Sequence, residues 1–176
     1  MNKTLLDEVI EHNRSFVDDH RYKQIIIDKK IHKKTVVISC MDARLIELLP
    51  GALNMKNSDY VSITTAGAMI NDPYDSVMKS LIVALHKFEI NEVFIVGHTD
   101  CGMNCLKTKD IIGELHPLDD EHSKWLDGFD DYQKNVLHSI NIIENHELVP
   151  DHIAVHGLLI HSGTDELELI KNGYLF

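Results

Sequence analysis

Short runs of β-branched and apolar residues alternate with longer segments of helical periodicity along most of this chain. Four such runs lie at residues 35–39, 60–65, 92–96 and 152–160. The first of them, at 35–39, is a β-branched apolar run, as a strand buried on both faces would be. Between them, segments 74–88 and 130–145 place apolar residues three to four positions apart, which is the spacing of one helix face. This alternation predicts an α/β fold, a mostly parallel central β-sheet flanked by helices.

The two ends of the chain add to this pattern. A fifth short run at 167–170 follows the fourth after a Gly-containing turn at 162–164, which predicts an antiparallel edge strand. Segments 4–19 and 21–31 are expected to be helical, and helix 74–88 should be capped by Asn71 or Asp72. No repeat or linker interrupts the sequence, so residues 1–176 are expected to form one domain.

The charge of the chain restricts its partners. The net charge of −11 argues against nucleic acid and anionic membranes, because both require a basic face. No run approaches the eighteen apolar residues of a membrane span. The segment at 1–16 is charged throughout and lacks the apolar stretch of a secretory signal, so a cytoplasmic location is expected.

Metal-binding side chains follow the first and third predicted strands directly. Cys40 comes after the run at 35–39, whereas His98 and Cys101 follow the run at 92–96. In an open parallel sheet, ligands collect beyond the carboxyl ends of strands where the chain order changes direction. If these two strands are neighbours, two sulfurs and one imidazole converge, and that set of donors suits Zn²⁺.

Three protein donors leave the fourth position of a tetrahedral zinc open, which is typical of a catalytic site. Zinc in such a site lowers the pKa of bound water to about 7, so hydroxide is available at neutral pH. Asp42 and Arg44 lie in the same short segment as Cys40. The guanidinium can hold the carboxylate as an acceptor, so Asp42 could orient the hydroxide or take the fourth metal position itself.

Two motifs together resemble the β-class carbonic anhydrases. They are Cys-x-Asp-x-Arg at 40–44 and His-x-x-Cys-Gly at 98–102, each closing a predicted strand. The similarity covers most of the chain, including the leading helix, the strand order and the closing segment 156–170. Thr99 after the ligand histidine, and the short length of the chain, resemble the compact branch of that family.

The resemblance implies an enzyme that hydrates carbon dioxide reversibly to bicarbonate by zinc-bound hydroxide. Cys40, His98 and Cys101 match the zinc ligands of the family. In some members the aspartate that matches Asp42 binds zinc in a closed resting state, so Asp42 is a possible fourth ligand here.

The resemblance also carries expectations for the pocket and the assembly. Asp42 and Arg44 match the catalytic Asp–Arg pair beside the metal, and Ala66 and Gly67 match the loop that lines the substrate pocket. The family assembles as homodimers or larger homo-oligomers. Helix 4–19 is therefore expected to pack on a dimer partner.

Some residues depart from the family and keep alternatives open. The pocket loop carries Thr64-Thr65 where members often have Arg-Asn, so the physiological substrate and turnover are open. One alternative is a zinc-binding relative with weak or no carbonic anhydrase activity, and another is a hydrolase of carbonyl sulfide or carbon disulfide. A thiol redox protein using Cys101 and Cys105 has poor support, because a Cys-x₃-Cys pair lacks a thioredoxin-like motif. Cys105 is instead expected to be an inert core residue.

The remaining polar residues have weaker expectations. Asp100 is expected to be solvated or to cap a helix, and His156 and His161 flank the end of the fourth strand as proton-shuttle candidates. Six other histidines are expected on solvated faces, namely His86, His116, His122, His138, His146 and His152.

Overall fold

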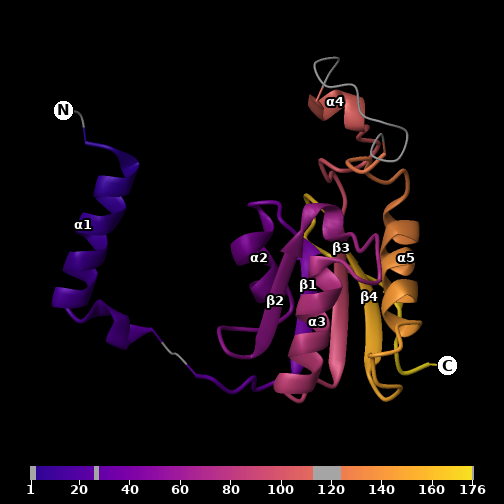
Figure 1. Cartoon of the computed structure of the whole chain (residues 1–176), viewed down its shortest axis with the longest axis horizontal. Coiled ribbons are helices and arrows are strands. Elements are labelled where there is room, and N and C mark those ends of the chain that lie inside the picture. Colours follow the sequence, from indigo (N-terminus) through magenta and orange to yellow (C-terminus); the bar gives the residue numbers. More distant parts are fainter. Residues whose placement is uncertain (1–2, 26–27, 113–123, 176) are drawn as a thin grey trace.

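The computed structural model describes residues 3–25, 28–112 and 124–175. Figure 1 shows the strands side by side, with helices packed around them and the amino-terminal helix standing apart. The elements in chain order are α1 (Leu5–Asp18), η1 (Arg21–Gln24), β1 (Thr35–Cys40), α2 (Leu45–Ala52), β2 (Tyr60–Thr65), η2 (Ala66–Ala68), α3 (Ser76–Lys87), β3 (Glu92–His98), α4 (Thr108–Ile112), α5 (Tyr132–Glu144), β4 (Ala154–Ile160) and β5 (Leu167–Lys171).

The five strands form one sheet in the order β2-β1-β3-β4-β5. Strands β2, β1, β3 and β4 are parallel, and β5 pairs antiparallel with β4 at the edge. The predicted α/β fold with a mostly parallel sheet and an antiparallel edge strand is therefore confirmed. Because β1 lies between β2 and β3, the chain order changes direction there, and the carboxyl ends of β1 and β3 meet at this point.

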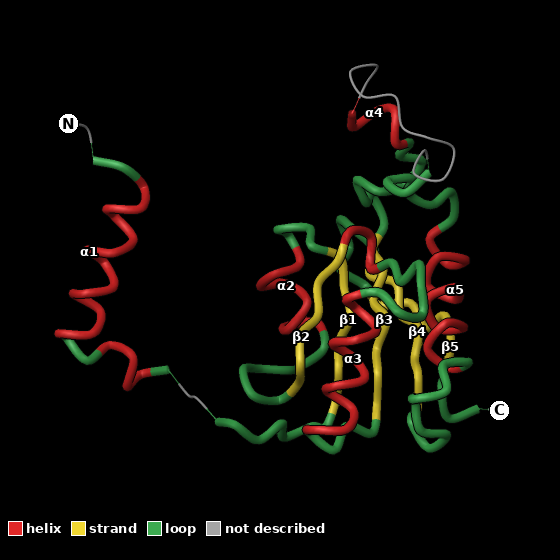
Figure 2. The backbone as a smooth tube through the Cα atoms, in the orientation of Figure 1, coloured by secondary structure: helices red, strands yellow, loops and turns green. Residues whose placement is uncertain are grey.

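Both faces of the sheet are covered by apolar side chains, and Figure 2 shows the helices that supply them. On one face, α3 and α5 pack on a core that includes Ile38, Ile95 and Val155. On the other face, α2 packs through Leu45 and Leu49 on β1 and β3. Burial of both faces explains why the central strands carry continuous apolar runs rather than alternating ones.

Three local predictions were wrong. Segment 21–31 forms only the short 3-10 helix η1, residues 26–27 lie outside the described part, and residues 28–34 are irregular. Helix α3 begins at Ser76, because the Asp75 carboxylate caps it by accepting from the Met78 N–H at 2.8 Å. Asp72 instead accepts from the N–H of Tyr74, within the turn before the helix.

Helix α2 was not predicted at all. It contains Pro50 and Gly51, which are residues typical of turns. The helix forms because Leu45 and Leu49 lie one turn apart and bury their side chains on the sheet, with exposures of 6% and 4%. Tertiary packing here outweighs the weak local propensity.

Besides the predicted ligand His98, two histidines are buried, and for one of them this is contrary to expectation. His146, predicted to be solvated, is buried beside Tyr74. His156 lies inside β4, where its ring stacks on Phe94 and its Nδ1 accepts from the Gly173 N–H. His116 and His122 lie outside the described residues. Within the described part of the chain, no helix is long and apolar enough to cross a membrane.

Candidate metal centre

Two neighbouring strands end at the same edge of the sheet and bring the predicted metal ligands together. Cys40 is the last residue of β1 and His98 is the last residue of β3. Ser39 pairs with Val96, so the two strand ends lie side by side. Cys101 returns to the same edge because the loop after β3 turns at Asp100, which has a left-handed φ of 55°.

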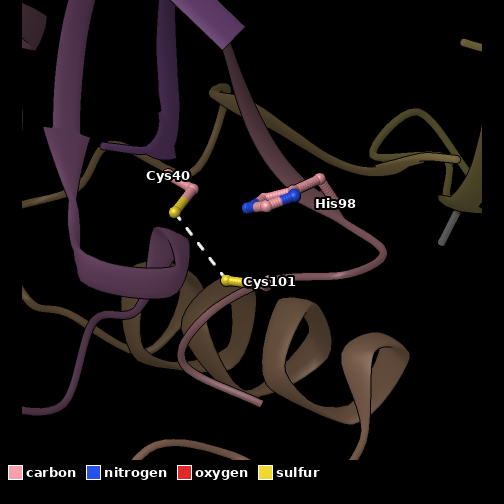
Figure 3. A group of neighbouring side chains, drawn as sticks. All are labelled: Cys40, His98 and Cys101. Atoms are coloured by element: carbon pink, nitrogen blue, oxygen red, sulfur yellow. Dashed lines mark hydrogen bonds between the residues drawn. The ribbon is translucent and has the colours of Figure 1, made fainter. Parts of the chain in front are cut away.

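The three side chains form a compact set of donor atoms, as Figure 3 shows. The Cys40 and Cys101 sulfurs and a ring nitrogen of His98 all lie within 4.8 Å of one another, and all three residues are buried. The two sulfurs are 3.8 Å apart. Tetrahedral zinc with Zn–S bonds of about 2.3 Å holds two sulfurs about 3.8 Å apart, so the spacing fits that ion.

The orientation of His98 also fits a metal ligand. Its Nδ1 lies 2.9 Å from the Thr99 carbonyl oxygen, so Nδ1 carries the proton in this contact. Its Nε2 is buried and has no hydrogen-bond partner among the described residues, which leaves the lone pair free for a cation. The Ser162 hydroxyl donates to the same Thr99 carbonyl at 2.7 Å, and the Ser162 N–H donates to the Thr99 hydroxyl at 2.8 Å.

The two sulfurs shift each other's pKa in opposite directions. The contact with Cys101 lowers the pKa of Cys40 to about 4, and the same contact raises the pKa of Cys101. Burial opposes the charged form of His98, but the adjacent Cys40 sulfur raises the pKa of His98 on balance. Crowding two sulfurs and an imidazole in a buried pocket favours a bound cation, which compensates the negative charge.

Asp42 and Arg44 pair beside this set. The Arg44 Nε and Nη2 atoms donate to the two Asp42 carboxylate oxygens at 3.0 and 2.8 Å. The Arg44 backbone N–H also donates to the Asp42 carboxylate at 2.9 Å. These bonds hold the pKa of Asp42 well below its usual range. The Asp42 Oδ2 atom lies 3.9 Å from His98 Nε2, so the carboxylate borders the donor set.

The loop after β2 forms another wall of the site. Ala66 and Gly67 lie in η2, and the buried Gly67 has a left-handed φ of 69°. The N–H groups of Gly67 and Asp42 both donate to the Cys40 sulfur, and these bonds favour its thiolate form. A side chain at Gly67 would come within 2.9 Å of Phe129, so the close approach of this loop depends on glycine.

One expectation near the site is confirmed and one was wrong. Asp100 is exposed, as expected, but its carboxylate also accepts from Arg44 Nη1 at 2.7 Å. Only the tertiary contact reveals this role, since Asp100 and Arg44 are 56 positions apart. Cys105 is exposed rather than part of the core, and it lies outside the three-donor set.

The two proton-shuttle candidates, His161 and His156, lie in different positions relative to the donor set. His161 follows Ile160, the residue that pairs with His98, and therefore lies at the same edge of the sheet as the donor set. Its Nε2 pairs with the Glu168 carboxylate at 2.9 Å. His156 pairs with Phe94, four residues before His98 along β3, so it lies away from the donor set.

Comparisons with known proteins agree with this geometry. A family model described as carbonic anhydrase matches residues 35–168. The Bacillus subtilis (strain 168) protein named "Putative carbonic anhydrase YvdA" is 39% identical over 182 residues, which cover 96% of this chain and 92% of that protein. A solved β-carbonic anhydrase from Trichomonas vaginalis has a TM-score of 0.85 and 27% identity, covering 97% of this chain and 100% of the other.

The chain is also similar to a protein named for a different activity. The carbon disulfide hydrolase of Acidithiobacillus thiooxidans is 24% identical over 157 residues, covering 77% of this chain and 76% of that protein. Fold and donor set together define an α/β protein with a Cys₂His donor set that could hold a metal at the switch point of its sheet. The chain belongs to the β-carbonic anhydrase family.

Proposed function

We propose that this protein binds Zn²⁺ through Cys40, His98 and Cys101 and catalyses the reversible hydration of carbon dioxide to bicarbonate. The observation that carries the proposal is the buried three-donor set, whose 3.8 Å sulfur separation fits tetrahedral zinc. No fourth histidine, cysteine or carboxylate joins the set among the described residues, so one corner is free for water or substrate. When bound, zinc supplies hydroxide at neutral pH by lowering the pKa of coordinated water to about 7.

The residues around the donor set have separate proposed tasks. Asp42 stays ionised because Arg44 stabilises its charge, so its Oδ2 atom is a permanent acceptor that orients the attacking water. Arg44 holds that carboxylate at the edge of the donor set. Ala66 and Gly67 supply backbone that closes the pocket over the Cys40 sulfur.

A related substrate is the second candidate. The similarity to a carbon disulfide hydrolase favours carbon disulfide or carbonyl sulfide, linear molecules that the same nucleophile can attack at carbon. Thr64 and Thr65 precede the Ala66-Gly67 loop, where many family members carry Arg-Asn. A third outcome is a zinc-binding relative with little activity on any of these substrates.

One sample tests these alternatives. Zinc is measured in protein never exposed to chelator, and CO₂ hydration is then followed by stopped flow from pH 6 to 9, an interval centred near the pKa of about 7 expected for zinc-bound water. We expect one zinc per chain and a hydration rate that rises toward alkaline pH. Release of H₂S from carbon disulfide or carbonyl sulfide, without CO₂ hydration, would favour the second candidate. Zinc-loaded protein that is inactive on all three substrates would favour the third.

The exposed apolar residues of the amino-terminal helix support a proposal about assembly. Helix α1 buries none of its side chains, and Leu6, Val9 and Ile10 are 68%, 55% and 46% exposed. Figure 1 shows α1 standing apart from the sheet. An isolated helix of this length is marginal in water, and an apolar stripe of this kind is stabilised by burial. We propose that α1 packs on a second copy of the chain in a homodimer or larger homo-oligomer.

Charges on the apolar stripe test this assembly. The double substitution Leu6→Glu and Ile10→Glu should shift the mass in solution from dimer or larger to monomer, because burial of two carboxylates is costly. Light scattering measures the mass, and Ser15→Glu on the same helix is the matched control. An unchanged mass in the double variant, or a monomeric wild type, would contradict the proposal.

The proposed location is the cytoplasm. Cys40, Cys101 and Cys105 are all free thiols. Two thiolates that hold zinc must stay reduced, and the cytosol maintains that state. Fractionation of the native cells tests the location, and we expect to detect the protein in the cytosolic fraction.

A further inference from the structure

The contact between Arg44 and Asp100 joins the two loops that follow β1 and β3. Arg44 lies four residues after Cys40, the last residue of β1, whereas Asp100 lies between His98 and Cys101 after β3. The Arg44 Nη1 atom donates to the Asp100 carboxylate at 2.7 Å, and Nη2 donates to the Asp100 backbone carbonyl at 2.8 Å. The guanidinium therefore binds Asp42 on one side and Asp100 on the other.

The loop at Asp100 is shaped to make this contact. Its φ of 55° is left-handed, which is uncommon for residues other than glycine and tolerated by aspartate. Its N–H donates to the Tyr132 hydroxyl at 3.2 Å, which ties the turn to α5. The backbone thus directs both the carbonyl and the carboxylate of Asp100 toward the same guanidinium.

Asp42 has two positively charged neighbours available once zinc is present. One is Arg44, which holds both carboxylate oxygens in this structure. The other is the cation site, because Asp42 Oδ2 lies 3.9 Å from the His98 Nε2 donor atom and carboxylates are ordinary zinc ligands. Whichever neighbour binds Asp42 decides whether the fourth position stays free for water.

The bonds to Asp42 hold only one side of the Arg44 guanidinium. The Arg44 side chain is 51% exposed, so water and side-chain entropy oppose a single fixed position for it. The Asp100 carboxylate is itself 78% exposed, and it acts together with the Asp100 backbone carbonyl, which accepts a second bond. With Asp100, four of the five Arg44 N–H groups are bonded, and the guanidinium is fixed between two loops. A fixed guanidinium loses less side-chain entropy in each further bond to Asp42.

We propose that Asp100 is a positioning residue that fixes Arg44 and so keeps Asp42 away from the metal, leaving the fourth coordination position open. The proposal rests on the zinc site proposed above. Removal of the Asp100 carboxylate leaves only the backbone carbonyl of residue 100 to hold that side of Arg44. Arg44 should then move more freely and allow Asp42 to bind zinc. Zinc would then be held by four protein ligands instead of three.

The rate of zinc release separates this role from a merely structural one. Glycine is the appropriate replacement, since it removes the carboxylate and accepts the left-handed φ without strain. We expect Asp100→Gly to release zinc to excess chelator more slowly than wild type, because a fourth protein ligand closes the site, and to hydrate CO₂ more slowly, because no position is left open for water. A structural role, in which the loop only loosens, gives faster release instead.

A double variant assigns the effect to Asp42. In Asp42→Asn with Asp100→Gly, zinc release should return to the rate of Asp42→Asn alone, because the carboxylate that would bind the metal is missing. Asp165→Gly is the matched control, since Asp165 is also exposed and has a left-handed φ of 58°. Its release rate and activity should equal those of wild type.

The outcomes distinguish this inference from the proposed function. Wild-type protein without stoichiometric zinc would overturn both. Zinc-loaded wild type, with release from Asp100→Gly that is unchanged or faster, would overturn only the role of Asp100. The same conclusion follows if slow release persists in the double variant.

Discussion

Cys40→Ser, His98→Ala and Cys101→Ser should each lose both zinc and CO₂ hydration. Each change leaves two protein donors where the structure brings three within 4.8 Å. Removal of one donor from a site with three protein ligands weakens zinc binding severely, because the serine hydroxyl does not ionise as a thiolate does and alanine offers no donor. We expect bound zinc to fall below about one-tenth per chain after dialysis, with a hydration rate at background.

Cys105→Ser is the control for this set. It removes a cysteine four residues from Cys101, but the thiol is exposed and lies outside the donor set. The variant should keep full zinc and full activity. Circular dichroism of each ligand variant checks that the sheet is intact. Full zinc in any one folded ligand variant would remove that residue from the site, and loss of zinc from Cys105→Ser would revise the ligand set.

Asp42→Asn should keep zinc and lose most of its activity. Asparagine has nearly the same shape, but it lacks the second acceptor oxygen and the charge that binds Arg44. Loss of a group that orients a reacting water or its proton typically costs about 10²-fold in rate. We therefore expect kcat/KM for CO₂ hydration to fall about 10²-fold while the zinc content stays at one per chain.

The pH dependence sharpens this prediction. Arg44 holds the pKa of Asp42 far below neutrality, so Asp42 is ionised throughout the working range and causes no change in rate near pH 7. The alkaline rise in rate should therefore survive in Asp42→Asn at a lower plateau. Glu47→Gln, an exposed carboxylate on α2, is the control and should behave as wild type. Full activity of Asp42→Asn would contradict the assigned role.

Much of the fold followed from local patterns. The buried strands β1 and β3 were predicted because their continuous apolar runs reflect coverage on both faces. Helix α2 was missed because Pro50 and Gly51 are poor helix formers, and only the burial of Leu45 and Leu49 on the sheet stabilises it. Local propensity and tertiary burial disagree in that segment.

The candidate site, like the fold, was predicted only in part from the sequence. The motifs at 40–44 and 98–102 predicted the donor side chains, because cysteine and histidine are the residue types that bind zinc and can be identified from sequence alone. The contact of Asp100 with Arg44 was not predicted, because it joins residues 56 positions apart. The expectation that Cys105 lies in the core was wrong, since its exposure depends on the path of the loop rather than on its residue type.

The sequence alone determined the class of fold, the family and the identity of the three candidate ligands, because periodicity and donor chemistry are properties of neighbouring residues. Only the tertiary structure decided that the two sulfurs lie 3.8 Å apart and that Arg44 lies between Asp42 and Asp100. Such distances depend on the order and register of β1 and β3, which bring together segments remote in the chain. Register arises from the packing of the whole sheet, and no local pattern specifies it.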